Sequence, residues 1–283
     1  MLQQHGSPTA WPLWVSIAWV SAVFLWSVIL EVYAVKGALH AACHLVWGMW
    51  LLVNICYHYY QAVHLAPGYT SDVDLQVLKD AMTFEWRWRG TCNGPKPPMC
   101  HHCSMCGRCV LRMDHHCPFT ANCVGAANYH HFFLFTLWLT LGCGYTSITS
   151  CLWHGKRFTD SSSASLQGHH AILLVCVVTG AVCCGLVVLL AWHCLVAVSG
   201  YGTLELMDRW LGPDSNDADA AEAHVHLPHV SCSFWGYLYS RGPRRNWQRA
   251  LRVSGRWWWL RWWLPAAAVR WDAAATSQRP GAR

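Results

Sequence analysis

The sequence predicts an α-helical integral membrane protein with four transmembrane helices and a cytosolic, cysteine-rich segment between the second and the third. Three observations support this fold class: 54% of the 283 residues are hydrophobic and only 12% are charged, four long stretches lack charged side chains, and cysteines and histidines cluster in one loop. Charged residues make up about 25% of an ordinary soluble domain. The chain therefore has the composition of a membrane protein.

Four apolar stretches are long enough to cross a bilayer, which takes about 20 residues in a helix. They are residues 11–30, 38–60, 132–153 and 171–198, and none contains Asp, Glu, Lys or Arg. One such stretch could be a buried core helix, but four in a short chain favour a membrane. The first lacks a preceding basic segment and the second follows closely, so we expect a span there and not a cleaved signal peptide.

The distribution of Lys and Arg predicts the orientation. Six lie in residues 61–131 and eleven in 199–283, so seventeen of the twenty lie in two segments that a pair of spans places on the same side. Positively charged loops stay in the cytosol. We therefore expect cytosolic termini and four parts: two helices in 1–60, the cysteine-rich domain in 61–131, two helices in 132–198, and a tail.

Seven of the sixteen cysteines lie between residues 92 and 123, together with four histidines. Disulfides are rare in the reducing cytosol, where such thiols tend to bind metal or to carry out chemistry. The Cys-x2-Cys spacing of zinc ligands recurs along Cys100, Cys103, Cys106 and Cys109. Two tetrahedral zinc sites would use eight of the eleven donors and leave three spare, and the metal would order a segment too polar to form its own core.

A second pattern within this segment points to a nucleophile. A free cysteine beside a histidine that an acid orients is activated, whereas a thiolate inside a closed zinc site reacts poorly. Asp114, His115 and Cys117 provide such an acid, histidine and cysteine within four residues. We expect His116, which lies between them, to point the opposite way toward a metal.

These residues belong to a recognisable motif. The stretch KPPMCHHCSMCGRCVLRMDHHCPFTANCVGAANYHHFF resembles the cysteine-rich domain of the DHHC-type protein S-acyltransferases, membrane enzymes that palmitoylate cysteines of other proteins. Four spans with this loop between the second and the third are also that family's arrangement. In the tail, GTLE at 202–205 resembles the family's Thr-Thr-x-Glu motif, and YSRGPRRNWQRAL at 239–251 resembles its C-terminal motif around an asparagine.

The resemblance implies two structural zinc ions. The ligands of one would be Cys103, Cys106, His116 and Cys123. The ligands of the other would be Cys92, His102, Cys109 and a cysteine three residues before the first of these. That last position is Arg89 here. We expect Cys100 to supply the missing thiolate, because in an extended segment it shares a face with His102; an incomplete or water-completed site is the alternative.

The resemblance also implies a two-step reaction. Cys117, deprotonated by His115 while Asp114 orients the imidazole, attacks the thioester of a long-chain acyl-CoA. The acyl group, typically palmitoyl, then passes to a cysteine of another protein. The expected partners are cytosolic or membrane-associated proteins with cysteines near the bilayer, and membrane lipid. No nucleic acid is expected, and an accessory subunit is left open.

Three further residues match weaker family positions. Lys96 corresponds to a position near the CoA head group, and Thr203 and Glu205 correspond to the tail motif near the active site, with Gly202 in place of its first threonine. Thr203 is therefore expected to hydrogen-bond near Asp114. The alternative for Thr203 and Glu205 is an ordinary helix start after the fourth span.

Two other functions are weighed against the enzyme. A membrane-anchored zinc-binding adaptor without activity is left open by Arg89, although the complete Asp114 to Cys117 motif argues against it. A ubiquitin ligase of the RING kind would need its ligands spread over a longer span of sequence.

We expect the protein to be located in an endomembrane, of the endoplasmic reticulum or Golgi, or in the plasma membrane. The tail GRWWWLRWWLPAAAVRW suits either a membrane surface or packing against the cytosolic domain.

Overall fold

The computed structural model describes residues 11–72, 87–89, 94–96, 99–159, 166–211 and 242–252. Cys92 and the tryptophan-rich tail lie outside these residues. The chain divides into two compact units: residues 1–60 and 133–192 form the helical unit, and residues 61–132 and 193–283 form the second unit. These two units do not show on which side of a membrane a segment lies. The predicted division into two pairs of helices, a cysteine-rich domain and a tail therefore remains a prediction.

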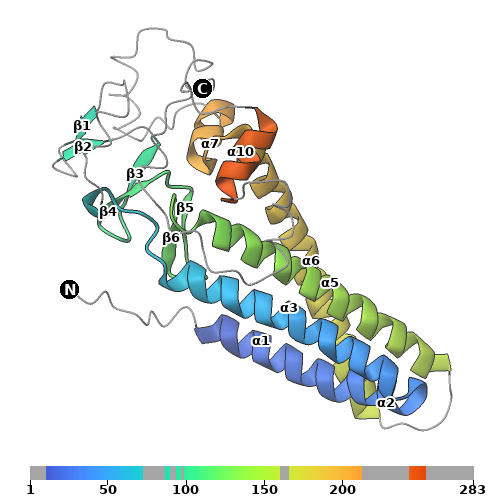
Figure 1. Ribbon diagram of the computed structural model, residues 1–283. Coiled ribbons are helices and arrows are strands. Elements are labelled where there is room, and N and C mark those ends of the chain that lie inside the picture. Colours follow the sequence, from blue (N-terminus) through green and yellow to red (C-terminus); the bar gives the residue numbers. More distant parts are fainter. Residues whose placement is uncertain are drawn as a thin grey trace. The chain divides into compact units, whose positions relative to one another are not determined.

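The helical unit is a bundle of long helices (Figure 1). Its elements are α1 (Trp11–Phe24), a π-helical turn (Leu25–Ile29), α2 (Leu30–Lys36), α3 (Ala38–His64), α5 (Tyr129–Thr159) and α6 (Leu166–Ser199), and the last three continue into the second unit. Polar contacts join neighbouring helices: the Ser147 hydroxyl of α5 donates to the Cys176 carbonyl of α6 at 2.9 Å. Apolar sequence drives these residues into helices, because only intrahelical hydrogen bonds satisfy the backbone in lipid.

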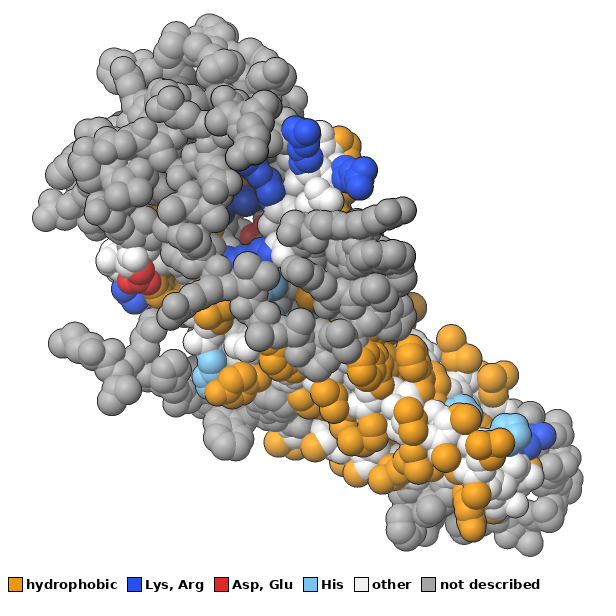
Figure 2. Space-filling model, viewed as in Figure 1, with side chains coloured by type: hydrophobic (Ala, Val, Ile, Leu, Met, Phe, Trp, Pro, Cys, Tyr) orange, Lys and Arg blue, Asp and Glu red, His pale blue; other side chains and the backbone are white. Residues whose placement is uncertain are grey.

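Three helices of the described chain are long and apolar enough to cross a membrane: Ala38–His64, Tyr129–Trp153 and His170–Ser199. They contain the second, third and fourth predicted spans. The first predicted span is not among them, because the apolar helix described there, Val15–Phe24, is shorter. Hydrophobic side chains cover much of the visible surface of this unit (Figure 2). Leu39, Val46 and Val188 are 76%, 72% and 72% exposed, and so many exposed apolar side chains on long helices suit a lipid environment.

The described residues of the second unit form three antiparallel hairpins and two short helices. The hairpins are β1 (Arg87–Arg89) with β2 (Gly94–Lys96), β3 (Cys100–Cys103) with β4 (Arg108–Leu111), and β5 (His115–Cys117) with β6 (Asn122–Val124). The helices are α7 (Thr203–Leu211) and α10 (Pro243–Ala250), and a 3-10 turn covers Thr70–Asp72. Two-stranded hairpins of this length are marginal by themselves, so other contacts or metal must stabilise them.

Asparagine side chains connect these short elements. The Asn122 amide donates to the Leu65 carbonyl after α3 at 2.9 Å. Asn128 accepts from the Gly125 N–H and donates to the Cys123 carbonyl, both at 2.9 Å. Gly125 leaves no room for a side chain, since a Cβ there would lie 2.6 Å from a Val110 methyl. The strand β6, the next turn and the start of α5 are thereby held in one arrangement.

Candidate active site and metal centre

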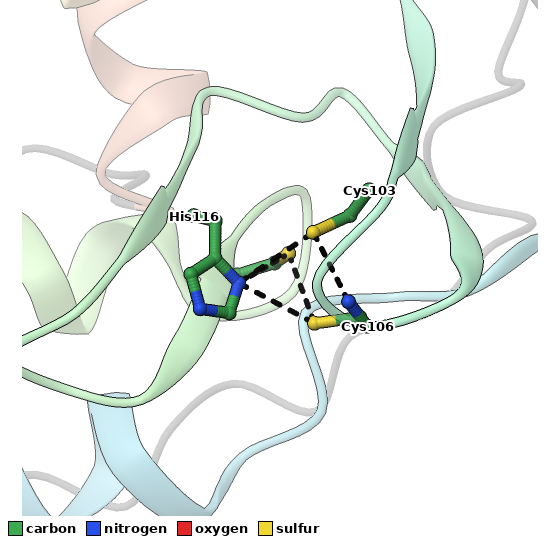
Figure 3. A group of neighbouring side chains, drawn as sticks. Cys103, Cys106 and His116 are labelled. Carbon is green, nitrogen blue, oxygen red and sulfur yellow. Dashed lines mark hydrogen bonds between the residues drawn. The ribbon is translucent and has the colours of Figure 1, made fainter. Parts of the chain in front are cut away.

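Four predicted ligands of one zinc ion meet in the second unit. Cys103 ends β3, Cys106 lies in the turn after it, and His116 and Cys123 face each other across the β5–β6 ladder. Opposed residues of an antiparallel pair share a face of the sheet. All four ligand atoms lie within 4.8 Å of one another, and Figure 3 shows the His116 ring turned toward the sulfur atoms.

The spacing of these ligand atoms suits zinc. His116 Nδ1 lies 3.5, 3.4 and 3.5 Å from the sulfurs of Cys103, Cys106 and Cys123, and the last two sulfurs are 3.4 Å apart. Tetrahedral zinc with ordinary bond lengths separates its ligands by about 3.5 to 3.8 Å. Burial raises the pKa of the Cys123 thiol, and so do the neighbouring sulfurs of Cys103 and Cys106. A bound cation would compensate this crowding of thiolates.

The other predicted zinc site is described only in part. His102 and Cys109 lie opposite each other in the β3–β4 ladder, with His102 Nδ1 3.7 Å from Cys109 Sγ. Cys100 is buried two residues before His102, on the same side of β3 by strand alternation. Cys92 lies outside the described residues, and of Arg89 only the backbone in β1 is described. No group of three close ligand atoms that includes Cys100 is found in the described part of the chain.

The nucleophile motif lies on the other face of β5. Because side chains alternate along a strand, His115 and Cys117 point away from the metal cluster while His116 points into it. The Asp114 carboxylate accepts a hydrogen bond from Nδ1 of His115 at 2.8 Å. The His115 imidazole in turn hydrogen-bonds the Cys117 thiol. The structure thus brings the predicted acid, histidine and cysteine together in that order.

The surroundings shift the pKa values of Asp114, His115 and Cys117. Burial alone would raise the pKa of Cys117, but hydrogen bonds from His115 and Thr120 outweigh it and lower that pKa. Burial opposes protonation of His115, yet Asp114 and Cys117 raise its pKa to about 9. For Asp114, burial is again outweighed by its partners, so its pKa is lowered. All three shifts act in the direction that favours a thiolate next to an imidazolium over a neutral thiol and imidazole.

The tail motif contacts this group directly. Thr203, the first residue of α7, donates its backbone N–H and its hydroxyl to Oδ1 of Asp114 at 3.0 and 2.8 Å. A carboxylate at a helix N-terminus is stabilised by the helix dipole. Glu205 accepts from the Gly202 N–H at 3.0 Å and contacts Nε2 of His101 at 2.9 Å. Thr203 therefore contacts the active-site motif directly, whereas Glu205 contacts His101 of β3.

The structure adds site residues that the sequence reasoning missed. Thr120 is buried, its hydroxyl donates to the Cys117 carbonyl at 3.4 Å, and its hydroxyl and N–H both lower the pKa of the Cys117 thiol. Phe132 packs edge-on against His115 with ring centroids 5.1 Å apart. The ring centroid of His193 in α6 lies 6.0 Å from that of His115. A hydroxyl three residues after the nucleophile was a usable signal for Thr120. Lys96 stands in β2, where the structure describes no side chain.

Comparison with known proteins supports the family resemblance of the cysteine-rich motif. A family model described as DHHC palmitoyltransferase matches residues 82–209. Palmitoyltransferase ZDHHC16 of Bos taurus is 30% identical over 280 residues, which cover 89% of this chain and 69% of the relative. The Mus musculus protein of that name is 31% identical over 264 residues, covering 89% and 67%. Palmitoyltransferase pfa3 of Neurospora crassa is 32% identical over 196 residues, covering 64% and 31%.

The similarity to the mammalian relatives extends over most of both chains, well beyond the short cysteine-rich motif. It includes the helices on either side of the motif and the segment that contacts Asp114. The arrangement of Asp114, His115 and Cys117 beside a cluster of metal ligands agrees with this similarity. The chain belongs to the DHHC palmitoyltransferase family.

Proposed function

We propose that this chain is a protein S-acyltransferase that moves a long-chain acyl group, typically palmitoyl, from acyl-CoA to Cys117 and then to cysteines of other proteins. The observation that carries the proposal is the hydrogen-bonded order of Asp114, His115 and Cys117 on one face of β5. A thiol with a lowered pKa, buried among Val124 and Phe132, is a suitable nucleophile for an apolar thioester.

In the first step, the Cys117 thiolate attacks the carbonyl carbon of the acyl thioester. The bond between that carbon and the CoA sulfur breaks, and the departing CoA thiolate takes the proton of the His115 imidazolium. Asp114 keeps the imidazole in the orientation that presents its other nitrogen to the sulfur. The acyl group is then joined to Cys117 as a new thioester.

In the second step, the thiol of a protein substrate gives its proton to His115 and attacks the acyl carbon. Cys117 leaves as a thiolate, and the donors of Thr120 and His115 stabilise that charge as they did before the reaction. One thioester replaces another in each step, so orientation near the bilayer is the main requirement. The substrates proposed are proteins with cysteines close to the membrane.

Zinc would serve as a structural ion in this chain. We propose one ion held by Cys103, Cys106, His116 and Cys123, and a second held by Cys92, His102 and Cys109 with Cys100 as the fourth ligand. When bound, zinc would order the short hairpins and so fix the backbone that presents Cys117. The fit of the first group to tetrahedral spacing supports this assignment.

A four-span topology with both termini in the cytosol is part of the proposal. Three helices of spanning length and the accumulation of Lys and Arg around the cysteine-rich segment support it. In that topology the active site faces the cytosol, where acyl-CoA is found. The membrane would be that of the endoplasmic reticulum, the Golgi or the cell surface.

The decisive experiment is to incubate the purified protein with a labelled palmitoyl-CoA analogue. The wild type should acquire a label that hydroxylamine removes, because thioesters are cleaved by hydroxylamine, and Cys117→Ser should not. Zinc content measured on the same samples shows that the protein is folded. A zinc-loaded wild type that takes no label would instead support the adaptor function, which the arginine at position 89 keeps as the second candidate.

A further inference from the structure

Small side chains form the contact between α5 and α6, which run side by side in the helical unit (Figure 1). The Ser147 hydroxyl of α5 donates to the Cys176 carbonyl of α6 at 2.9 Å. The same hydroxyl lies 2.9 Å from the position that a Cβ on Gly180 would take. Transmembrane helices approach each other this closely where small residues meet. The two backbones are therefore close together at this point of the bundle.

Further contacts give the register of the two antiparallel helices. Cys183 Sγ lies 3.6 Å from the Thr140 carbonyl oxygen and 3.3 Å from the position of a Cβ on Gly144. A step of seven residues, about two helical turns, forward along α5 and backward along α6 converts the first of these contacts into the hydrogen bond at Cys176. The same step converts the second contact into a pairing of Cys151 with Cys176.

The thiols of Cys151 and Cys176 do meet in the structure. They lie within hydrogen-bonding reach of each other, and both are free thiols. Cys151 is exposed and Cys176 is half-buried, so a reagent can reach the first of them. A disulfide requires two cysteines on closely approaching backbones, with Cα atoms about 4.4 to 6.8 Å apart. The close packing beside Gly180 suits that requirement.

Both cysteines lie toward the ends of their helices that are remote from the cysteine-rich segment in sequence. Cys151 is two residues before the end of the candidate span Tyr129–Trp153, and Cys176 is six residues after the start of the span His170–Ser199. In the four-span topology of the proposed function, on which this inference rests, these ends face the secretory lumen or the cell exterior. Those compartments are oxidising, and disulfides persist there.

We propose that Cys151 and Cys176 form a disulfide bond that joins the third and fourth predicted spans at their non-cytosolic ends. The oxidant would be a protein or small-molecule disulfide of that compartment. The exposed Cys151 thiolate attacks it, and one carrier sulfur leaves as a thiol. The Cys176 thiolate then attacks the Cys151 sulfur and releases the second carrier thiol. The carrier disulfide is reduced to two thiols, which take up the two protons that the cysteines lose.

A second pair of thiols in the same helices provides a matched control. Cys143 of α5 is close enough to Cys183 of α6 for the two thiols to interact electrostatically. Cys183 lies seven residues beyond Cys176, which is about 10 Å deeper along the helix. Hydrocarbon at that depth disfavours the thiolate that disulfide exchange requires. Oxidation is therefore expected at the outer pair and not at the inner pair.

The test counts disulfides in the full chain expressed in cells. The cells are quenched with trichloroacetic acid, and free thiols are blocked with N-ethylmaleimide in SDS, so that neither burial nor zinc protects a thiol. After reduction, a polyethylene glycol maleimide should add two tags to most wild-type molecules. Cys151→Ser and Cys176→Ser should each lose both tags. Cys143→Ser and Cys183→Ser should each keep both.

A wild type that takes no tags, or that keeps two tags in both Cys151→Ser and Cys176→Ser, would overturn the proposal and leave these cysteines as packing residues. Loss of the tags in both control variants would overturn it as well. The zinc content of each variant shows that it is folded. Because tags are counted without acyl transfer, a tagged but inactive protein would reject the proposed activity alone. An active protein without tags would reject the disulfide alone.

Discussion

Thr203 donates two hydrogen bonds to the same carboxylate oxygen of Asp114, one from its backbone at 3.0 Å and one from its hydroxyl at 2.8 Å. The two residues are 89 positions apart, yet the contact joins the first residue of α7 to the start of the active-site strand. The other oxygen of Asp114 is left to His115. The tail therefore acts on the nucleophile through one carboxylate.

Replacing Thr203 should slow acylation without unfolding the protein. Thr203→Val keeps the side-chain shape and removes the hydroxyl donor to a charged oxygen, a bond worth about 1.5 to 3 kcal/mol. We expect the rate of acyl-enzyme formation to fall at least about tenfold, as measured with labelled palmitoyl-CoA under single-turnover conditions. Thr203→Ser retains the donor and should stay within a few-fold of the wild type; a loss as large as that of valine would contradict the role of the hydroxyl.

Removing the His115 imidazole should change the pH at which Cys117 reacts. In the wild type the pKa of Cys117 is lowered, so the thiolate persists at pH values where an ordinary thiol is protonated. In His115→Gln the apolar surroundings remain and the imidazolium is lost, so the pKa should rise. The pH profile of Cys117 alkylation by iodoacetamide should therefore shift toward alkaline pH. An unchanged profile would show that His115 does not control the thiolate.

The two zinc sites can be separated by metal analysis. Cys100→Ala should reduce the zinc content from about two ions to about one if Cys100 completes the second site, because three ligands bind zinc weakly. Cys106→Ala tests the other site and should also remove about one ion. Mass spectrometry under native conditions counts the ions directly. A Cys100→Ala protein that keeps the wild-type zinc content would remove Cys100 from the ligand set.

Gly125 offers a stability test that leaves all reactive groups in place. A methyl group at Gly125 would lie 2.6 Å from a Val110 methyl and 2.8 Å from the Pro67 carbonyl oxygen. Relieving such overlap typically costs about 1 to 3 kcal/mol, so Gly125→Ala should lower the melting temperature by several degrees. Gly48→Ala is the control, since nothing lies within 4 Å of its added Cβ. Equal melting temperatures for both variants would contradict the close packing.

The sequence allowed the chemistry to be predicted further than the fold. The family resemblance implied that Cys103, Cys106, His116 and Cys123 bind one zinc ion, and the structure brings these four side chains together. The sequence analysis also expected His116 to point the opposite way from its neighbours, toward a metal. The structure agrees, because side chains alternate along β5 and His116 joins the metal cluster.

Contacts between distant segments could not be predicted in the same way. His193 approaches His115 from the end of α6, and Asn122 reaches the carbonyls after α3, because of tertiary packing that no local pattern encodes. The position of Thr120 beside Cys117 follows from the turn after the nucleophile. Threonine is common in turns for reasons unrelated to catalysis, so its presence there did not indicate a role. The first predicted span, residues 11–30, is helical in the structure, but a π-helical turn at Leu25–Ile29 interrupts it, and no composition pattern indicates that turn.

The three residues of β5 tie two tasks to one piece of backbone. His116 faces the metal ligands while His115 and Cys117 face the active site, so a shift of one residue in strand pairing would exchange the two sets. An insertion or deletion inside this strand would therefore abolish metal binding and acyl transfer together. Among the described strands, β5 is the one that carries both a ligand of the metal cluster and the nucleophilic cysteine.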